Sequence, residues 1–481
     1  MQEQILNIVA KANSYLADYI LIVLLVGVGL FFTIKTKFVQ VRCFGEGMKK
    51  VFGNIKLFGG KSEGGLSSFQ ALATAIAAQV GTGNIVGASG AILTGGPGAI
   101  FWMWVIAFLG MATIYAEAVL AQETRITDKN GEIHGGPVYY IKKAFPNGFG
   151  TFLSVFFAIA VILALGFMGS MVQSNSIAGS METVFDASKS NILFSLGGID
   201  VTVTAAIVGV IVAAVAAFIF IGGINRIASV TEKLVPVMAC LFLLGGLVII
   251  IARITDIPAT FGMIFKYAFT PQALIGGGIG YALKTAISQG AKRGLFSNEA
   301  GMGSTPHAHA MANVEKPHDQ GVVAMIGVFI DTFVVLTMTA LVVITCLFTG
   351  LEATGNAADY TAALEGITKA NAMQLAVGSV FGSNFGNIFV AICLLFFAFS
   401  TILSWNFFGK INVQSLTKNS KAGVVVYSII AIVFIFLGSL LSNDLVWELT
   451  DMFNQLMVVP NVIAMLALSG LVIAEAKSSK K

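Results

Sequence analysis

The residues with the clearest chemical potential lie in one short segment, QVGTGNIVGA at positions 79–88. Gln79, Thr82 and Asn84 supply uncharged polar side chains there, between glycines in an otherwise apolar sequence. Each glycine costs a helix about 1 kcal/mol relative to alanine, so we expect the helix to unwind near Gly81 and Gly83. The freed N–H groups can bind an anion and the freed carbonyl groups can bind a cation. The segment predicts a binding site made of backbone and uncharged side chains.

Two other interpretations of this segment are a nucleotide-binding loop and a helix-packing face. Its glycines stand at positions 81, 83 and 87, which is not the GxGxxG spacing, and an apolar span has no strand beside it. Gly83 and Gly87 form a GxxxG pair, which allows a neighbouring helix to approach closely. Nucleotide binding is therefore disfavoured, and packing alone stays open.

The acidic side chain expected nearest the middle of an apolar segment is Asp331. Intramembrane ionisable residues are functional candidates, so Asp331 with Asn84 predicts a second cation site or a proton-coupled position. An internally paired carboxylate is the structural alternative. We expect Glu117 and Asp451 nearer the membrane interfaces, and Glu299 at the cap of a cytoplasmic helix. No catalytic pair is recognised within the spans, which disfavours an enzyme.

The composition requires a membrane to hold these residues. Of the 481 residues, 56% are hydrophobic and 11% are charged, whereas soluble proteins have about 25% charged residues. This chain cannot cover soluble domains with polar surface, so its partner is the lipid bilayer, and a disordered chain is excluded. The formal net charge of +4 gives no reason to expect a nucleic acid partner.

The apolar segments predict an all-α polytopic membrane protein with eleven spans, since a hydrocarbon core needs about 20 residues per helix. The spans are 17–34, 67–94, 98–121, 149–180, 199–221, 228–252, 272–291, 321–349, 380–408, 423–441 and 446–474. Lys and Arg prefer cytoplasmic loops. With the N-terminus outside, the outward-facing basic residues among the 28 are only Lys11, Lys189, Arg253, Lys266 and Lys369. We therefore expect an outer N-terminus and a cytoplasmic C-terminus.

The second and seventh spans both contain glycine clusters that predict a break. In the seventh span the cluster is Gly276, Gly277, Gly278, Ile279 and Gly280. Five spans separate the two clusters, so the second half would be inverted relative to the first, as in inverted-repeat secondary transporters. The expected division is an extra N-terminal helix with a basic loop (1–64), two five-helix repeats (65–255 and 256–475) and a cytoplasmic tail (476–481).

Several motifs resemble conserved blocks of the alanine or glycine:cation symporter family, the sodium/alanine symporters of prokaryotes. The motifs are QVGTGNIVGA (79–88), GGPGAIFWMW (95–104), GGPVYYI (135–141), AKRGLFSNEAGMGSTPHAHA (291–310) and FAFSTILSWNFFG (397–409). The resemblance covers essentially the whole chain. It implies a leucine-transporter-type fold in a prokaryotic cell membrane, a small neutral amino acid as substrate and Na⁺ as the usual coupling ion.

The resemblance also implies roles for individual residues. The amides of Thr82 and Gly83 would bind the carboxylate, Gln79 and the carbonyl groups of 276–280 would face the ammonium group, and Phe167 and Trp405 would wall off the side chain. The fold's common sodium position corresponds to the carbonyl groups of Ala77, Val80 and Phe397 with the hydroxyl groups of Ser400 and Thr401. Ser and Thr often bond only to their own helix, which is the alternative for the last two.

The resulting hypothesis is uptake of L- or D-alanine or glycine coupled to Na⁺, by alternating access and without a cofactor. Proton coupling with another small solute is an alternative, and an ion channel is a further one. Discrimination over one methylene is worth only about 1–3 kcal/mol, so the sequence leaves open the choice between alanine and glycine, together with stereoselectivity, stoichiometry and oligomeric state.

Overall fold

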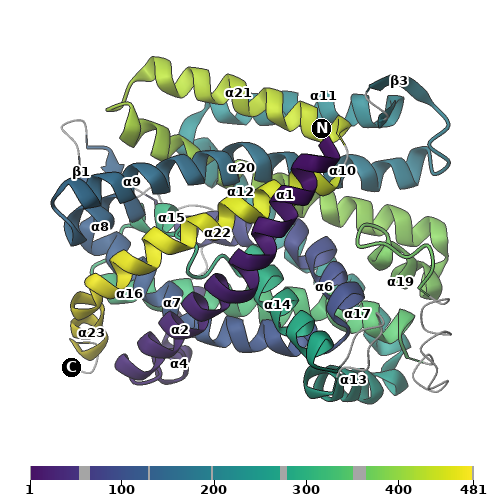
Figure 1. Ribbon diagram of the computed structural model, residues 1–481, viewed down its shortest axis with the longest axis horizontal. Helices are drawn as coiled ribbons and strands as arrows, with labels where there is room; N and C mark the ends of the chain where they lie inside the picture. Colours follow the sequence, from purple (N-terminus) through teal and green to yellow (C-terminus); the bar gives the residue numbers. More distant parts are fainter. Residues whose placement is uncertain are drawn as a thin grey trace.

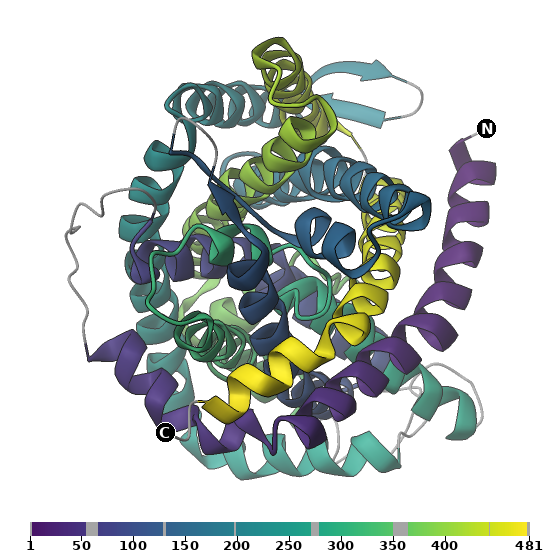
Figure 2. The same ribbon diagram turned by 90° about the vertical axis from the view of Figure 1, so that its left-hand side faces the viewer.

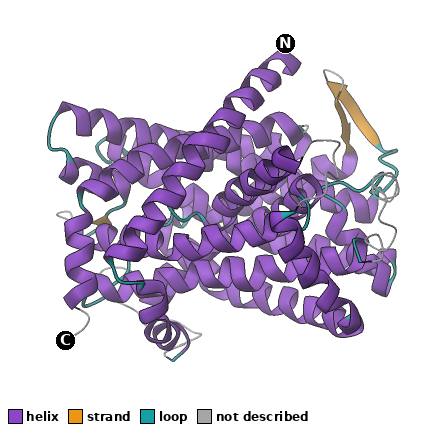
Figure 3. Cartoon of the chain, turned by 60° about the horizontal axis from the view of Figure 1, so that its bottom comes forward, coloured by secondary structure: helices purple, strands orange, loops and turns teal. Residues whose placement is uncertain are grey.

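The computed structural model is a bundle of long helices (Figure 1). It describes residues 2–53, 66–127, 131–196, 199–270, 279–349, 364–441 and 443–478. Helices dominate these ranges, and two short antiparallel hairpins lie at the surface, of which the longer is conspicuous at one edge in Figure 3. Each long helix satisfies its own backbone groups, which is the arrangement a bilayer demands.

The elements occur in the following order. The first part of the chain holds α1 (Gln2–Tyr15), η1 (Leu16–Leu21), α2 (Ile22–Lys35), α3 (Val39–Arg42), α4 (Phe44–Phe52), α5 (Ser68–Gln79), η2 (Gly83–Gly87), α6 (Ala88–Gly95), α7 (Ala99–Thr124), β1 (Ile126–Thr127), β2 (Ile133–His134) and α8 (Pro137–Ala144). The middle part holds α9 (Gly148–Val161), η3 (Ile162–Gly169), α10 (Ser170–Phe185), β3 (Ile192–Leu196), β4 (Ile199–Thr202), α11 (Val203–Ile221), α12 (Gly223–Ala252), η4 (Ile254–Asp256), α13 (Ile257–Phe269), α14 (Ile279–Asn298) and α15 (Pro306–Ala310). The last part holds α16 (Pro317–Val328), η5 (Phe329–Leu336), α17 (Thr337–Leu347), α19 (Ala372–Phe381), α20 (Ser383–Leu416), α21 (Lys421–Leu440), α22 (Asn443–Ala467) and α23 (Ser469–Ser478).

The described residues contain nine helices that are long and apolar enough to span a membrane, and the bent pair α5 and η2–α6 makes a tenth. The polytopic all-α architecture is therefore confirmed. The first span is longer than predicted, because one continuous helix runs from Gln4 to Lys35. The predicted span 272–291 begins outside the described residues, and α14 continues past it to Asn298. The full number of eleven spans stays a prediction.

The two ends of the bundle carry different connecting segments. Figure 1 shows α4, α8 and α23 at the left-hand end, and α13, α19 and β3 at the right-hand end. These are the two groups that the predicted alternation assigns to the cytoplasmic and the outer side. We refer to them as the α4 end and the α13 end. The first helix lies at the periphery of the bundle (Figure 2).

The first predicted break is present. A capping box starts α5, in which Ser67 Oγ accepts from the N–H of Gln70 and Gln70 Oε1 accepts from the N–H of Ser67. The helix ends at Gln79, because Val80 leaves the helical region with φ −81° and ψ 87°. The chain turns by 45° and resumes as η2 and α6. Gly81 is required there, because a Cβ at this position would collide with Thr401 Oγ1 of α20.

The glycine cluster predicted to break the seventh span lies mostly outside the described residues. Gly276, Gly277 and Gly278 lie outside the described residues, and Ile279 and Gly280 belong to the helix α14. The described residues contain a break further along the chain: helical backbone ends at Asn298, and the buried segment 299–305 joins α14 to α15. Glu299, Gly301 and Gly303 have φ values of 57°, 92° and 81° there. Left-handed backbone cannot continue a right-handed helix, so this segment is the break.

Candidate functional site

The two breaks face each other inside the bundle. Gln79 Nε2 donates to the carbonyl oxygen of Asn298 at 2.7 Å, so the ends of α5 and α14 meet. A Cβ at Gly83 would lie 3.0 Å from the ring of Phe296 and 3.2 Å from Ser297 Cα. Both helices point their C-terminal carbonyl groups at this meeting place, and η2 begins there with its N-terminal amides. Carbonyl ends favour cations and amide ends favour anions, so the centre can hold both charges of a zwitterion.

Polar atoms without a partner gather around the first break. Thr82 Oγ1, Gln79 Oε1 and Gln173 Nε2 are buried and have no hydrogen-bond partner among the described residues. Gln173, on α10, also accepts from the N–H of Thr82 through Oε1 at 3.1 Å. Burying an unpaired polar atom costs about 1–3 kcal/mol. These atoms are therefore suited to a polar ligand, and Gln173 is a site residue that the sequence analysis missed.

Trp405 lies beside the second break, at segment 299–305. Its Nε1 donates to Glu299 Oε1 at 2.5 Å, and its ring stands edge-on to Phe296 with centroids 5.9 Å apart. Gly169 of η3 packs directly against the indole, because a Cβ there would collide with it. Trp405 and Phe296 thus form the apolar wall of the site.

Phe167, predicted to wall off the substrate side chain, lies against α21. Its ring packs against Tyr427 and Phe434 of α21, with centroids 5.6 and 4.9 Å apart. Residues two positions apart on a helix point about 200° away from each other. Because Gly169 faces Trp405, Phe167 faces the opposite side of this segment, and its place in the site stays a prediction.

Two carboxylates shape the second break. Glu117 of α7 is fully buried and accepts from the N–H groups of Gly301 and Gly303 at 3.1 and 2.9 Å, and from Asn461 Nδ2 at 2.6 Å. The sequence suggested that Glu299 caps a cytoplasmic helix, but Glu299 lies in the segment that follows α14 and accepts from Ser304 and Trp405. The expected depth of Glu117 near an interface stays a prediction. Both carboxylates hold the non-helical segment in shape.

The structure brings together four of the five groups predicted at the sodium position. Thr401 Oγ1 donates to the carbonyl oxygens of Ala77 at 2.9 Å and Phe397 at 3.0 Å. Ser400 Oγ lies 2.9 Å from the Phe397 oxygen and 3.4 Å from the Ala77 oxygen. The fifth, Val80, lies at the turn just after α5. Oxygen atoms from α5 and α20 thus converge, whereas ordinary back-bonding would involve α20 alone.

Asp331 is the centre of a second polar cluster. It is fully buried on η5 and accepts from Asn84 Nδ2 at 2.6 Å, Ser297 Oγ at 2.9 Å and Thr332 Oγ1 at 2.8 Å. The cluster thereby joins η2, α14 and η5. π-Helical turns such as η2 and η5 often mark functional sites. No cationic side chain is bonded to this carboxylate among the described residues, so a bound cation or a proton can balance its charge.

A buried ion cluster lies next to the site, between α14 and α22. Asp451 of α22 is 2% exposed and lies 2.9 Å from Lys292 Nζ and 3.1 Å from an Arg293 Nη. The Arg293 guanidinium stacks over Trp447, whose ring is 5.1 Å from that of Phe296. Asp451 was expected nearer an interface; its side chain is enclosed by protein, and its depth in the membrane stays a prediction. We call Lys292, Arg293 and Asp451 the outer ion cluster.

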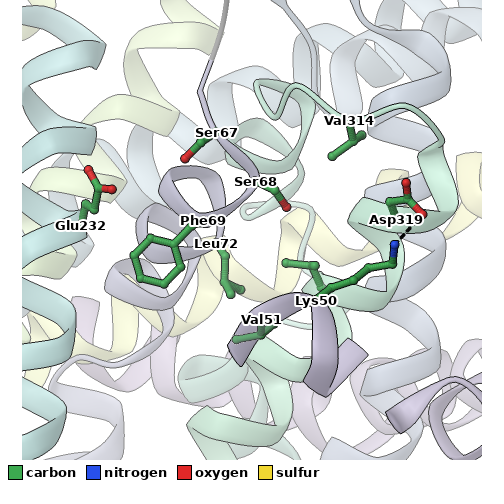
Figure 4. Close-up of a pocket in the computed structure, with 10 residues that line it drawn as sticks. Lys50, Val51, Ser67, Ser68, Phe69, Leu72, Glu232, Val314 and Asp319 are labelled. Carbon is green, nitrogen blue, oxygen red and sulfur yellow. Dashed lines mark ion pairs between the residues drawn. The ribbon is translucent and has the colours of Figure 1, made fainter. Parts of the chain in front are cut away.

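Two cavities open on the other side, around the start of α5. One of about 350 Å³ is lined by residues such as Leu66, Met311, Phe407 and Ile411. Another of about 320 Å³ lies between α4, α5, α12 and α16. Figure 4 shows the second cavity, with Ser67 and Ser68 of the α5 start in the middle and Glu232 across from the Lys50–Asp319 ion pair. Both of these cavities therefore lie at the α4 end of the molecule.

The chain is similar to a known family of proteins and to a solved structure. The model of the sodium:alanine symporter family matches residues 2–481. The sodium/alanine symporter AgcS of Methanococcus maripaludis is 41% identical over 98% of this chain and 96% of its own length. A putative sodium/proton-dependent alanine carrier protein, YrbD of Bacillus subtilis, is 39% identical over 96% of this chain and 90% of its own. The crystal structure of MhsT in complex with L-phenylalanine matches with a TM-score of 0.56 and 15% identity, covering 85% of this chain and 99% of that one.

Proposed function

Because this chain belongs to the sodium:alanine symporter family, whose members are transporters, we propose that it takes up a small neutral amino acid, alanine or glycine, together with Na⁺. The observation that carries the proposal is the pair of opposed breaks, where two carbonyl ends and one amide end meet around unpaired polar atoms. Its fold, shared with MhsT, is of the leucine-transporter type.

The site suits a zwitterion better than an ion. A zwitterion has no net charge, so backbone dipoles and neutral side chains can bind it without burying an unpaired charge. We assign the carboxylate to the Gly83 amide, Thr82 Oγ1 and Gln173 Nε2, since the Thr82 amide is already bonded to Gln173. The ammonium group faces the carbonyl ends of α5 and α14, which Gln79 links together.

The size of the substrate follows from the apolar wall. Trp405 is 1% exposed and packed between Phe296 and Gly169. Because this wall is tightly packed, adding a methylene group to the substrate there costs about 1–3 kcal/mol. A methyl group or a hydrogen at the substrate's Cα therefore fits better than a branched side chain.

We place the coupling Na⁺ among the oxygens of Ala77, Val80, Phe397, Ser400 and Thr401. Oxygen donors without thiols or imidazoles suit a hard cation. An ion there would join α5 to α20 and so favour the arrangement that binds substrate. The linkage is reciprocal, so the substrate would raise the affinity for Na⁺ by the same factor.

Asp331 supports a second cation in the same cycle. Asn84, Ser297 and Thr332 surround its carboxylate with further oxygens. Proton transfer at Asp331 is the alternative coupling, and it would make uptake depend on a pH gradient rather than on Na⁺.

The direction of transport follows from the two ends. We assign the α13 end to the outside and the α4 end to the cytoplasm of a prokaryotic cell, with the N-terminus outside and two inverted five-helix repeats following the first helix. The outer ion cluster is then the closed outer gate, and the cavities around α5 are the inner vestibule.

Binding of radiolabelled alanine to the purified protein tests this proposal. In Na⁺ we expect saturable binding that glycine displaces and that phenylalanine does not, and in K⁺ we expect none. A matched pair of variants separates the site from the helix that supports it: Thr82→Ala changes the break, and Thr74→Ala changes α5. Binding that is equal in Na⁺ and K⁺, or equal in both variants, would refute the assigned site.

A further inference from the structure

A cysteine, a carboxylate and an imidazole converge at the α4 end, outside the transport site. One ligand atom each from Cys43, Glu46 and His318 lies within 4.8 Å of the other two. Cys43 stands between α3 and α4, Glu46 is in the first turn of α4, and His318 is the second residue of α16. Segments far apart in the sequence thus supply the three atoms.

The imidazole is oriented toward the other two groups. His318 Nδ1 is hydrogen-bonded to the hydroxyl group of Tyr115 at 2.8 Å, and Nε2 lies 3.3 Å from Glu46 Oε2. The Tyr115 ring supports it edge-on, with centroids 5.6 Å apart. The peptide N–H of His318 donates to Glu475 of α23 at 3.1 Å. A histidine that binds a metal through one nitrogen commonly has the other held in this way.

The three groups differ in exposure in a manner that permits entry. Cys43 and His318 are 4% and 3% exposed, whereas the side chain of Glu46 is 40% exposed. Burial raises the pKa of the Cys43 thiol. A bound cation would offset this, because coordination favours the thiolate. Glu46 also lies 3.8 Å from Lys50, which pairs more closely with Asp319 at 3.1 Å.

The donor set selects the kind of metal. Zn²⁺ binds sulfur at about 2.3 Å and nitrogen or oxygen at about 2.0–2.2 Å, so ligand atoms around a tetrahedral ion lie about 3.3–3.8 Å apart. The three ligand atoms lie within 4.8 Å of one another, and His318 Nε2 and Glu46 Oε2 are already 3.3 Å apart. Ca²⁺ and Mg²⁺ require oxygen ligands and do not fit a thiolate with an imidazole.

We propose that Cys43, Glu46 and His318 form a binding site for a zinc-type divalent cation, with water as the fourth ligand. The ion ties α4, in the segment before the broken helix α5, to α16, whose continuation η5 carries Asp331. It acts as a structural clamp at the α4 end and is separate from the proposed sodium positions.

Metal binding to the full-length protein tests the proposal. The purified protein is stripped with a chelator, incubated with Zn²⁺ or Co²⁺, and measured by mass spectrometry of bound metal and by absorption of the Co²⁺ form. We expect about one Zn²⁺ per chain and a sulfur-to-cobalt charge-transfer band. Cys43→Ser should abolish the band, and His318→Gln should weaken Zn²⁺ binding by more than about tenfold.

Matched controls keep the result specific. Cys393→Ser, a buried cysteine elsewhere, and His309→Gln, a buried histidine elsewhere, should bind Zn²⁺ as the parent does. Glu46→Gln changes only the exposed ligand, so it tests the site even where the buried variants fail to fold. A parent protein without bound Zn²⁺, a Co²⁺ form without the charge-transfer band, or unchanged affinity in folded Glu46→Gln would overturn the proposal.

Discussion

Replacing Asp451 by Asn should open the outer side of the transporter. Asp451 contacts Lys292 Nζ at 2.9 Å and Arg293 at 3.1 Å, and the two cationic side chains are 10% and 11% exposed. Asparagine keeps the size of the side chain but removes the charge. It therefore leaves the buried Arg293 without its anion in the closed state, and leaves Lys292 with only the longer contact to Glu448 at 3.7 Å.

The structure sets the scale of the effect. Removing one partner of a buried ion pair costs about 3–5 kcal/mol. Asparagine still accepts one hydrogen bond, so we take the lower figure of about 3 kcal/mol. If the pair exists only when the outer side is closed, the balance between closed and open states shifts about 100-fold toward open, at 1.36 kcal/mol per factor of ten.

Accessibility of a buried position measures this shift. Gln455 lies one helical turn beyond Asp451 on α22 and is 4% exposed. Gln455→Cys is placed in a chain whose four native cysteines are replaced, and a membrane-impermeant thiol reagent is added from outside. We expect Asp451→Asn to accelerate modification by about 100-fold.

A matched variant controls for general loosening. Asp444 pairs with Lys369 at 3.7 Å, but its side chain is 78% exposed, and exposed pairs contribute only about 0–1 kcal/mol. Asp444→Asn should leave the rate unchanged. Equal rates in Asp451→Asn and the parent, with both proteins folded, would refute the assignment of the outer ion cluster as a gate.

The remaining predictions concern the coupling ions and the substrate. Thr401→Ala removes one oxygen from the proposed sodium position and should raise the Na⁺ concentration for half-maximal uptake by about tenfold, as expected for loss of one charge-assisted contact; an unchanged Na⁺ dependence would contradict that position. Trp405→Ala should admit valine, as measured by competition with alanine uptake, and an unaltered competition profile for glycine, alanine and valine would count against a wall role. Asp331→Asn should change the number of cations moved per substrate, measured as charge per amino acid, and an unaltered ratio would remove Asp331 from coupling.

The first break was predictable from sequence because its signal is local. Gly81 and Gly83 weaken the helix, and Gln79 and Thr82 are polar where lipid-facing residues would be apolar. The structure has the helix ending at Gln79 and resuming at Gly83. Backbone preference alone was sufficient there.

The break at 299–305 was not predicted, because no dense glycine cluster marks it. The dense cluster at 276–280 attracted the prediction, whereas the break uses Gly301 and Gly303 with left-handed backbone. Its stability depends on Glu117, which is distant in sequence and bonds to both amides. Such a contact has no local signature, although the G-x-G spacing after Asn298 was visible.

Side-chain direction explains the remaining differences. Phe167 and Gly169 lie in the same segment, yet only Gly169 faces Trp405. Gln173 lies one turn further along and reaches Thr82. The sequence alone does not give the rotation of this helix about its axis. It could therefore indicate the segment but not the residue that faces the site.

Uptake into proteoliposomes tests the central claim most directly. Radiolabelled L-alanine is supplied with an inward Na⁺ gradient, an inward K⁺ gradient, or a proton gradient alone. We predict accumulation above equilibrium with Na⁺ only. Accumulation driven by protons alone would contradict sodium coupling and would indicate proton coupling at Asp331. The absence of alanine uptake under every gradient would contradict the proposed substrate.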